Sequence, residues 1–283
     1  MPVWKVQMVP VDIIGKRVLL TALLGASLLM AGCSSDDAAP EYVEQPVQVL
    51  YNKALADLNS ENYLEAARGF DEVERQHPYS VWSTKAQLMS AFAYYQSNKY
   101  DQAILAADRF IELHPGNKDV PYAHYLIAIS YYEQISGVGR DQKVTRQALE
   151  ALQRVVRRFP NTEYARDAKL KIDLTRDHLA GKEMEIGRYY QKSDQYVAAI
   201  NRFRQVIERY QTTTHVPEAL HRLTESYLAL GIEDEAKNAA AVLGYNFPGS
   251  EWYQDSYALL DENYLRPEIK EDSWMTKVWK SIF

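Results

Sequence analysis

Histidines, carboxylates and paired glycines are the residues of this chain that could carry out metal, acid–base or phosphate chemistry. The six histidines show no metal-binding pattern, and His215 and His221 lie six residues apart without a carboxylate at ligand spacing. Gly137 and Gly139 form a single G-x-G with neither a third glycine nor a P-loop lysine, so a phosphate cradle is not indicated. The carboxylates lie beside lysines and arginines, as on solvated helix faces. We therefore expect a protein that is not an enzyme, with no catalytic residues, no metal site and no cofactor.

Cys33 is the only cysteine of the chain, and the residues before it predict lipidation. A basic pair precedes a short apolar run, residues 18–30, which is typical of a secretory signal and too short to span a bilayer comfortably. The run leads into Met30-Ala31-Gly32-Cys33, which resembles a bacterial lipobox with Met30 in place of the usual leucine. We expect residues 1–32 to be a lipoprotein signal peptide and Cys33 to carry the covalent lipid anchor.

The residues that follow the signal peptide indicate where the mature chain is located. Residues 33–46 are polar, acidic and contain proline, so we interpret them as a lipid-anchored linker. Ser34, rather than an aspartate, follows the cysteine, which favours the outer membrane. The formal net charge of −6 gives little support for a nucleic-acid partner.

A recurring alanine shows that one helical unit is repeated along the chain. An apolar residue follows each alanine four positions later, and a proline follows four of the five alanines twelve positions later. A tyrosine precedes three of the alanines by nine positions. This order and spacing match the tetratricopeptide pattern. The alanines are Ala66, Ala103, Ala148, Ala199 and Ala236.

The repeats predict an all-α fold, a tetratricopeptide-repeat superhelical solenoid of about five helix pairs over residues 47–265. A helix over residues 251–264 is expected to cap the last apolar face. A long helix over residues 163–192 contains Gly181, and a glycine in a helix interior costs about 1 kcal/mol, which permits a kink or break there.

The last residues predict a linker and an amphipathic segment over residues 266–283. Apolar side chains of residues 273–283 recur at helical spacing, and two of them are tryptophans. We predict a short helix that binds a partner subunit or the membrane surface. In the alternative, the apolar stripe folds back on the last repeat.

Aromatic residues on the first helices of the repeats, and in the turns before them, predict a surface that binds peptides. The candidates for binding a substrate peptide are Tyr79, Trp82, Tyr122 and Tyr125. In the alternative, these rings belong to the hydrophobic core. Tyr79 and Trp82 lie in the turn between two repeats, where burial is less assured.

Several continuous runs of residues carry a resemblance that the repeats alone do not explain. They include HPYSVWSTKAQL (77–88), the segment at 93–115, RFPNTEYARDAKLKI (158–172) and RDHLAGKEMEIGRYY (176–190). On these runs the chain resembles the BamD family (also called YfiO or ComL), the tetratricopeptide lipoproteins of the outer-membrane β-barrel assembly (BAM) machinery. The resemblance covers nearly all of residues 33–265.

The resemblance implies a function in binding and positioning. Members of this family dock on the POTRA domains of the barrel protein BamA, lie near other BAM lipoproteins, and receive unfolded outer-membrane proteins. The turn that contains Tyr79 and Trp82 falls where the family has its substrate-side aromatic residue. Asn201 and Arg202 fall where the family has an arginine that faces BamA. In the alternative, the chain is a periplasmic tetratricopeptide lipoprotein that scaffolds peptidoglycan synthesis or hydrolysis enzymes.

Overall fold

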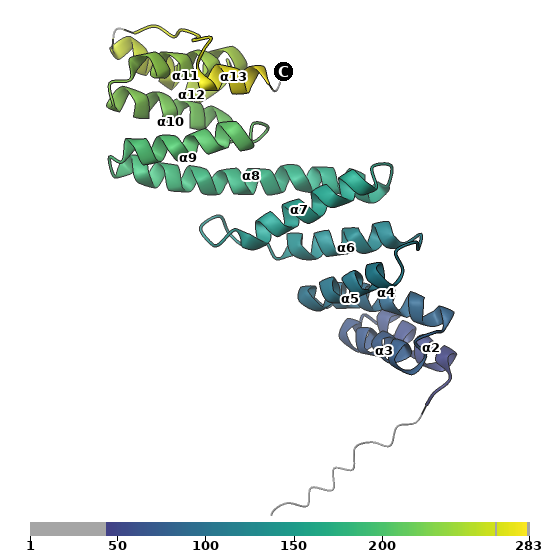
Figure 1. Ribbon diagram of the computed structural model, residues 1–283. Coiled ribbons are helices and arrows are strands. Elements are labelled where there is room, and N and C mark those ends of the chain that lie inside the picture. Colours follow the sequence, from purple (N-terminus) through teal and green to yellow (C-terminus); the bar gives the residue numbers. More distant parts are fainter. Residues whose placement is uncertain (1–43, 264, 282–283) are drawn as a thin grey trace, which may run out of the picture. The chain divides into compact units, whose positions relative to one another are not determined.

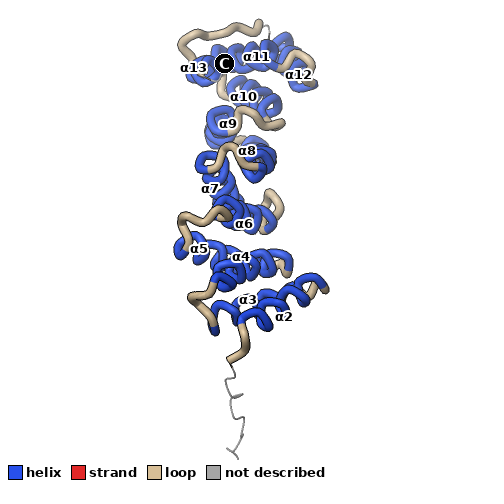
Figure 2. Tube along the Cα trace, turned by 90° about the vertical axis from the view of Figure 1, so that its right-hand side faces the viewer, coloured by secondary structure: helices blue, strands red, loops and turns tan. Residues whose placement is uncertain are grey.

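Helices follow one another without interruption by strands in the part of the chain that the structure describes (Figures 1 and 2). The structure is a computed structural model that describes residues 44–263 and 265–281. The signal peptide, Cys33 and nearly all of the linker predicted above lie outside the described residues. The helices are α2 (Val47–Asn59), α3 (Tyr63–Gln76), α4 (Val81–Gln96), α5 (Tyr100–Leu113), α6 (Val120–Glu133), α7 (Lys143–Arg158), α8 (Glu163–Lys192), α9 (Tyr196–Arg209), α10 (Val216–Ala229), α11 (Glu233–Asn246), α12 (Glu251–Glu262) and α13 (Trp274–Lys280).

Consecutive helices pack against each other from α2 to α12. The helices α2, α4, α6, α8, α10 and α12 also contact one another in that order, so they form a continuous row, which we call the first-helix row. The pairs α2–α3, α4–α5, α6–α7, α8–α9 and α10–α11 are the five predicted repeats, and α12 covers the last of them. The described helices therefore confirm the predicted all-α tetratricopeptide solenoid.

The repeated residues explain why the helices pair. All five repeat alanines are fully buried, which lets the second helix of each pair approach the first closely. The turn inside four of the five pairs has one residue with positive φ, always five positions before the repeat alanine. A left-handed residue reverses the chain in a short turn and lets the two helices lie antiparallel. These residues are Glu61, Asn98, Asp194 and Gly231.

Helix α8 is continuous through Gly181, so the break that the sequence permitted at this glycine does not occur. Its first half packs on α7 and α6, and its second half packs on α9 and α10. Gly181 is buried, and a Cβ there would lie 3.2 Å from Nε2 of His215. A side chain at this position would make a tight contact with His215, the residue that precedes α10, and the glycine avoids it.

Gly187→Ala is expected to lower the free energy of unfolding by about 2 kcal/mol, because it overpacks the core between α8 and α9. A Cβ at position 187 would lie 2.4 Å from Cε1 of Phe203, whose ring is fully buried. Gly116→Ala is the matched control, since a Cβ there meets nothing within 4 Å. Urea unfolding followed by far-UV circular dichroism measures both variants. Equal midpoints would contradict the close α8–α9 contact.

The carboxy-terminal segment folds back on the last two repeats, as in the alternative considered for it from the sequence. Helix α13 packs on α9 and α11, and Met275 and Trp279 are 0% and 9% exposed. The segment before it is fixed to α11, because the backbone N–H of Lys270 donates to Oδ1 of Asn238 at 2.8 Å. The apolar stripe of α13 is therefore covered by the chain itself.

Candidate binding surfaces

The turn between α3 and α4 presents one exposed aromatic ring, and the packed ring of Trp82 lies on the first turn of α4, not in the turn between the repeats as expected from the sequence. Ser80 caps α4 by accepting a hydrogen bond from the backbone N–H of Ser83 at 3.0 Å, which fixes the turn. The side chain of Tyr79 is fully exposed. Trp82 is half-buried, and its ring lies 4.8 Å from the ring of Tyr51 on α2. Of the two residues predicted here, Tyr79 is the one whose whole side chain faces solvent.

Tyr122 and Tyr125 lie together on α6, in the first-helix row. Both rings contact Tyr164 of α8, at centroid distances of 5.5 Å and 5.2 Å. The hydroxyl of Tyr125 donates to Oδ2 of Asp167 at 2.7 Å. We call Tyr122, Tyr125, Tyr164 and Asp167 the tyrosine cluster. Trp82 packs with a different group of core residues, so the four predicted peptide contacts form two separate surfaces.

Burial in the tyrosine cluster raises the pKa of its phenols above the ordinary tyrosine value. Burial, and then the neighbouring Tyr164, raise the pKa of Tyr122 to about 12. Burial raises the pKa of Tyr125 further, and the Asp167 carboxylate that accepts its hydrogen bond adds to this effect. The cluster therefore presents half-buried rings, and the hydroxyl of Tyr125 is already bonded to Asp167.

Arg202 lies on α9, where a carboxylate of α8 orients it. Its Nη1 donates to Oε2 of Glu183 at 3.0 Å, and the arginine side chain is 35% exposed. A guanidinium carries five N–H donors, so this contact leaves donors for a second acceptor. Asn201, the neighbouring residue, is exposed. The pair thus presents polar groups on α9.

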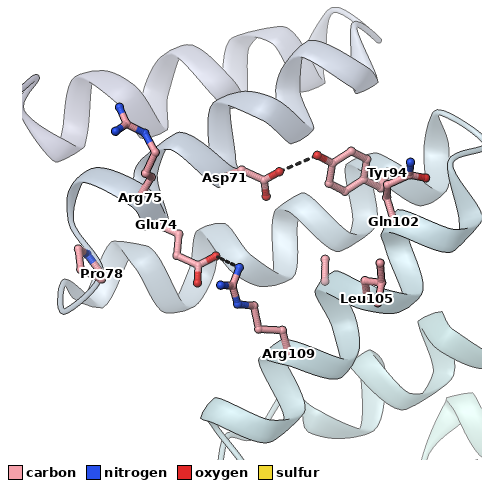
Figure 3. A pocket seen from close by; sticks show the side chains of 9 residues that line it. Asp71, Glu74, Arg75, Pro78, Tyr94, Gln102, Leu105 and Arg109 are labelled. Carbon is pink, nitrogen blue, oxygen red and sulfur yellow. Dashed lines mark hydrogen bonds and ion pairs between the residues drawn. The ribbon is translucent and has the colours of Figure 1, made fainter. Parts of the chain in front are cut away.

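A pocket of about 770 Å³ between α3 and α5 is a feature that the sequence analysis missed (Figure 3). Pro78, Tyr94, Leu105 and Ala106 contribute apolar surface to it. Charged side chains surround this surface, and Arg109 forms an ion pair of 3.5 Å with Glu74. One sequence signal could have indicated the pocket, because Leu105 lies off the apolar stripe of its helix. In the structure, Leu105 is 70% exposed.

His221 has the partners of a catalytic histidine but not the exposure. Its Nδ1 lies 2.8 Å from Oγ of Ser256, and its Nε2 lies 3.4 Å from Glu225, a carboxylate that the sequence analysis did not pair with it. Burial alone would raise the pKa of Glu225, but hydrogen bonds from His221 and Arg222 lower that pKa to about 2. Ser256 is fully buried, so this arrangement packs α10 against α12 and offers no nucleophile to a substrate. Among the described residues, no group of histidines and acidic residues has metal-binding geometry.

Five helix pairs, capped by α12, define the described part of the chain as a protein of the tetratricopeptide-repeat class. Residues 43–243 match the YfiO family model, described as an outer membrane lipoprotein. The chain is 54% identical over 258 residues to the outer membrane protein assembly factor BamD of Caulobacter vibrioides, covering 90% of this chain and 85% of the relative. The chain belongs to the YfiO/BamD family.

Two further relatives carry the same name. The chain is 47% identical to BamD of Rickettsia prowazekii, with 87% of this chain and 97% of the relative covered. It is 35% identical to BamD of Neisseria meningitidis serogroup A, with 83% and 92% covered. A thermophilic TPR protein from Thermus thermophilus is a more distant structural neighbour, with a TM-score of 0.35, 18% identity, and 76% and 98% of the two chains covered. A likeness this low adds nothing to the helix pairing described above.

Proposed function

We propose that this chain is a lipid-anchored subunit of the outer-membrane β-barrel assembly machinery that acts by binding and positioning, without catalysis. Membership of the YfiO/BamD family is the observation that carries the proposal. The geometry agrees with it, because the described surfaces combine rings, hydroxyls and an oriented arginine, which suit peptide and protein partners. The scaffold for peptidoglycan enzymes considered from the sequence is not favoured, since the named relatives are outer membrane protein assembly factors.

The lipid on Cys33 holds the protein at the periplasmic face of the outer membrane in this proposal. Residues 1–32 are the signal peptide, 33–46 the linker, 47–265 the solenoid and 266–283 the carboxy-terminal segment. No described helix is long and apolar enough to cross a bilayer. The several acyl chains of a bacterial lipoprotein exceed the two signals that stable anchoring requires.

Cys33→Ala is expected to abolish lipidation, because the thiol that receives the lipid is lost and the chain contains no other cysteine. The variant should accumulate as an unprocessed precursor or leave the outer-membrane fraction. Palmitate labelling of cells measures the outcome, and Ser34→Ala serves as the control that keeps the thiol. Equal palmitate incorporation into the Cys33 variant and the parent would refute the assignment.

Two surfaces carry out the proposed binding. Asn201 and Arg202 on α9 dock on the POTRA domains of BamA, where the guanidinium pairs with a carboxylate of the partner. Other BAM lipoproteins bind near these last repeats. Tyr79 with Trp82, and the tyrosine cluster with Tyr122 and Tyr125, receive the carboxy-terminal strand of unfolded outer-membrane proteins. Trp82 contributes less contact area than Tyr79, because its ring packs against α2.

Tyr79→Ala is expected to weaken binding of a peptide that ends in the aromatic residue typical of barrel strands by about fivefold to tenfold. Its side chain is fully exposed, so the melting temperature should not change. Fluorescence anisotropy of the labelled peptide with the mature protein measures the affinity. Tyr245→Ala is the matched control, since Tyr245 is also exposed but lies in the last repeat.

The two variants distinguish a substrate surface from a general aromatic effect. A selective loss of affinity in Tyr79→Ala supports the turn as a peptide contact. Identical affinities for Tyr79→Ala, Tyr245→Ala and the parent would remove the turn from the proposed substrate surface. The tyrosine cluster would then be the remaining candidate.

A further inference from the structure

The pocket between α3 and α5 has a counterpart elsewhere in the chain that is already filled. When the repeats are aligned on their alanines, α3 corresponds to α9 and α5 corresponds to α11. The groove between α9 and α11 holds helix α13. The pocket between α3 and α5 stands in the same place relative to its own repeats, and it is open (Figure 3).

The correspondence can be followed position by position, although only the tyrosine is shared as a residue type. Five residues that line the pocket align with five residues that line the groove of α13. The aligned pairs, with the pocket residue given first and the groove residue second, are Asp71 with Arg204, Tyr94 with Tyr227, Gln102 with Glu235, Leu105 with Asn238, and Arg109 with Val242.

The groove residues hold α13 through specific contacts. The guanidinium of Arg204 lies 4.1 Å from the ring centroid of Trp274, and Tyr227 belongs to the core against which that ring packs. The hydroxyl of Ser273 donates to Oε2 of Glu235 at 2.9 Å. Asn238 accepts a hydrogen bond from Thr276, and Val242 lines the same pocket as Trp279. These positions therefore form a seat for a short amphipathic helix.

We propose that the pocket between α3 and α5 binds a short amphipathic helix supplied by a partner protein. The pocket differs from the filled groove at four of the five aligned positions, and the differences at Asp71 and Leu105 specify the helix. Asp71 stands where Arg204 contacts Trp274, and its carboxylate accepts hydrogen bonds from two neutral hydroxyls, those of Ser90 and Tyr94. A carboxylate there requires a lysine or arginine of the partner in place of the tryptophan. Leu105 requires an apolar side chain.

A second copy of this chain does not satisfy these requirements with its own α13. Trp274 would lose the cation that stacks on it, because position 71 is an acid. Thr276 and the backbone N–H of Lys270 would lose the acceptor that Asn238 provides, because position 105 is a leucine. Helix α13 is also seated on its own repeats. The complementary partner is therefore a helix with one apolar face and a cation directed at Asp71.

The test uses the mature full-length protein and two labelled peptides. One peptide has the sequence of residues 266–283, and the other is the same peptide with Trp274→Arg and Thr276→Leu, the changes that Asp71 and Leu105 call for. We expect the substituted peptide to bind at least about tenfold more tightly, because one charge-assisted hydrogen bond alone gives about that factor. Leu105→Asp should abolish its binding. Leu113→Asp is the matched control, because Leu113 is an exposed leucine of the same helix outside the pocket.

Three results would overturn the proposal. The first is equal affinity for both peptides, or no binding of either at about 1 mM. The second is binding that survives Leu105→Asp, which would show displacement of α13 from its own groove. The third is self-association in sedimentation velocity that Leu105→Asp removes and Leu113→Asp keeps, which would make a second copy the occupant. Circular dichroism of each variant confirms that the helices are intact before binding is compared.

Discussion

Arg202→Glu is expected to lower the affinity of the mature protein for a POTRA fragment of BamA by about 30-fold, or about 2 kcal/mol. The guanidinium is held by Glu183 at 3.0 Å and keeps further donors for a carboxylate of the partner. Reversing its charge removes these donors and places a second carboxylate beside Glu183. Isothermal titration calorimetry against the POTRA fragment measures the loss.

The double variant Arg202→Glu with Glu183→Arg distinguishes docking from folding. It restores an ion pair between α8 and α9 but presents the opposite charge on α9. If Arg202 binds BamA, the double variant should recover its stability in urea and remain defective in binding. Recovery of both properties would show that Arg202 only joins the two helices, and unchanged affinity in the single variant would remove it from the proposed site.

Trp279→Ala is expected to lower the free energy of unfolding by about 3–5 kcal/mol, as for other buried large aromatic residues. The ring is 9% exposed and meets the ring of Phe247 edge to face at 5.9 Å. Its loss removes one of the contacts that seat α13 on α11. Urea unfolding measures the effect, and Ile269→Ala, a change of an exposed residue at the same end of the chain, is the control.

An unchanged unfolding midpoint for Trp279→Ala would mean that α13 does not rest on the last repeats in solution. The carboxy-terminal segment would then regain the role considered from its sequence, that of an element for a partner or a membrane surface. If Trp279→Ala loses stability but still binds its partners, the result supports the packing of α13 on the last repeats.

The helix pairing could be predicted because each repeat carries its own local signals. A buried alanine, a large apolar residue and a terminating proline recur at set distances, and each depends on contacts within one pair or with its neighbour. The left-handed turns were less visible, because Glu61 and Asp194 occupy positions where glycine or asparagine is the usual signal. The sequence permitted a break at Gly181 that does not occur, because a glycine required by packing and a glycine that ends a helix cannot be distinguished from sequence alone.

The surfaces could be predicted only in part. The sequence placed Tyr122 and Tyr125 on one helix, but their contact with Tyr164 depends on how α6 meets α8. Trp82 carried no sign that it packs on Tyr51, more than thirty positions earlier. The pocket beside Leu105 lies between α3 and α5, the second helices of the first two repeats. Their spacing is set by α4, which packs against both. Such features depend on packing over long sequence separations, which periodicity does not report.

Co-purification from detergent-solubilised envelopes tests the proposed function most directly. The full-length lipoprotein, tagged after residue 283 and expressed from its own promoter, is isolated and its partners are identified by mass spectrometry. We predict that BamA is recovered in stoichiometric amount with the parent protein and is depleted with Arg202→Glu. Recovery of peptidoglycan synthases or hydrolases in the absence of BamA would contradict the account.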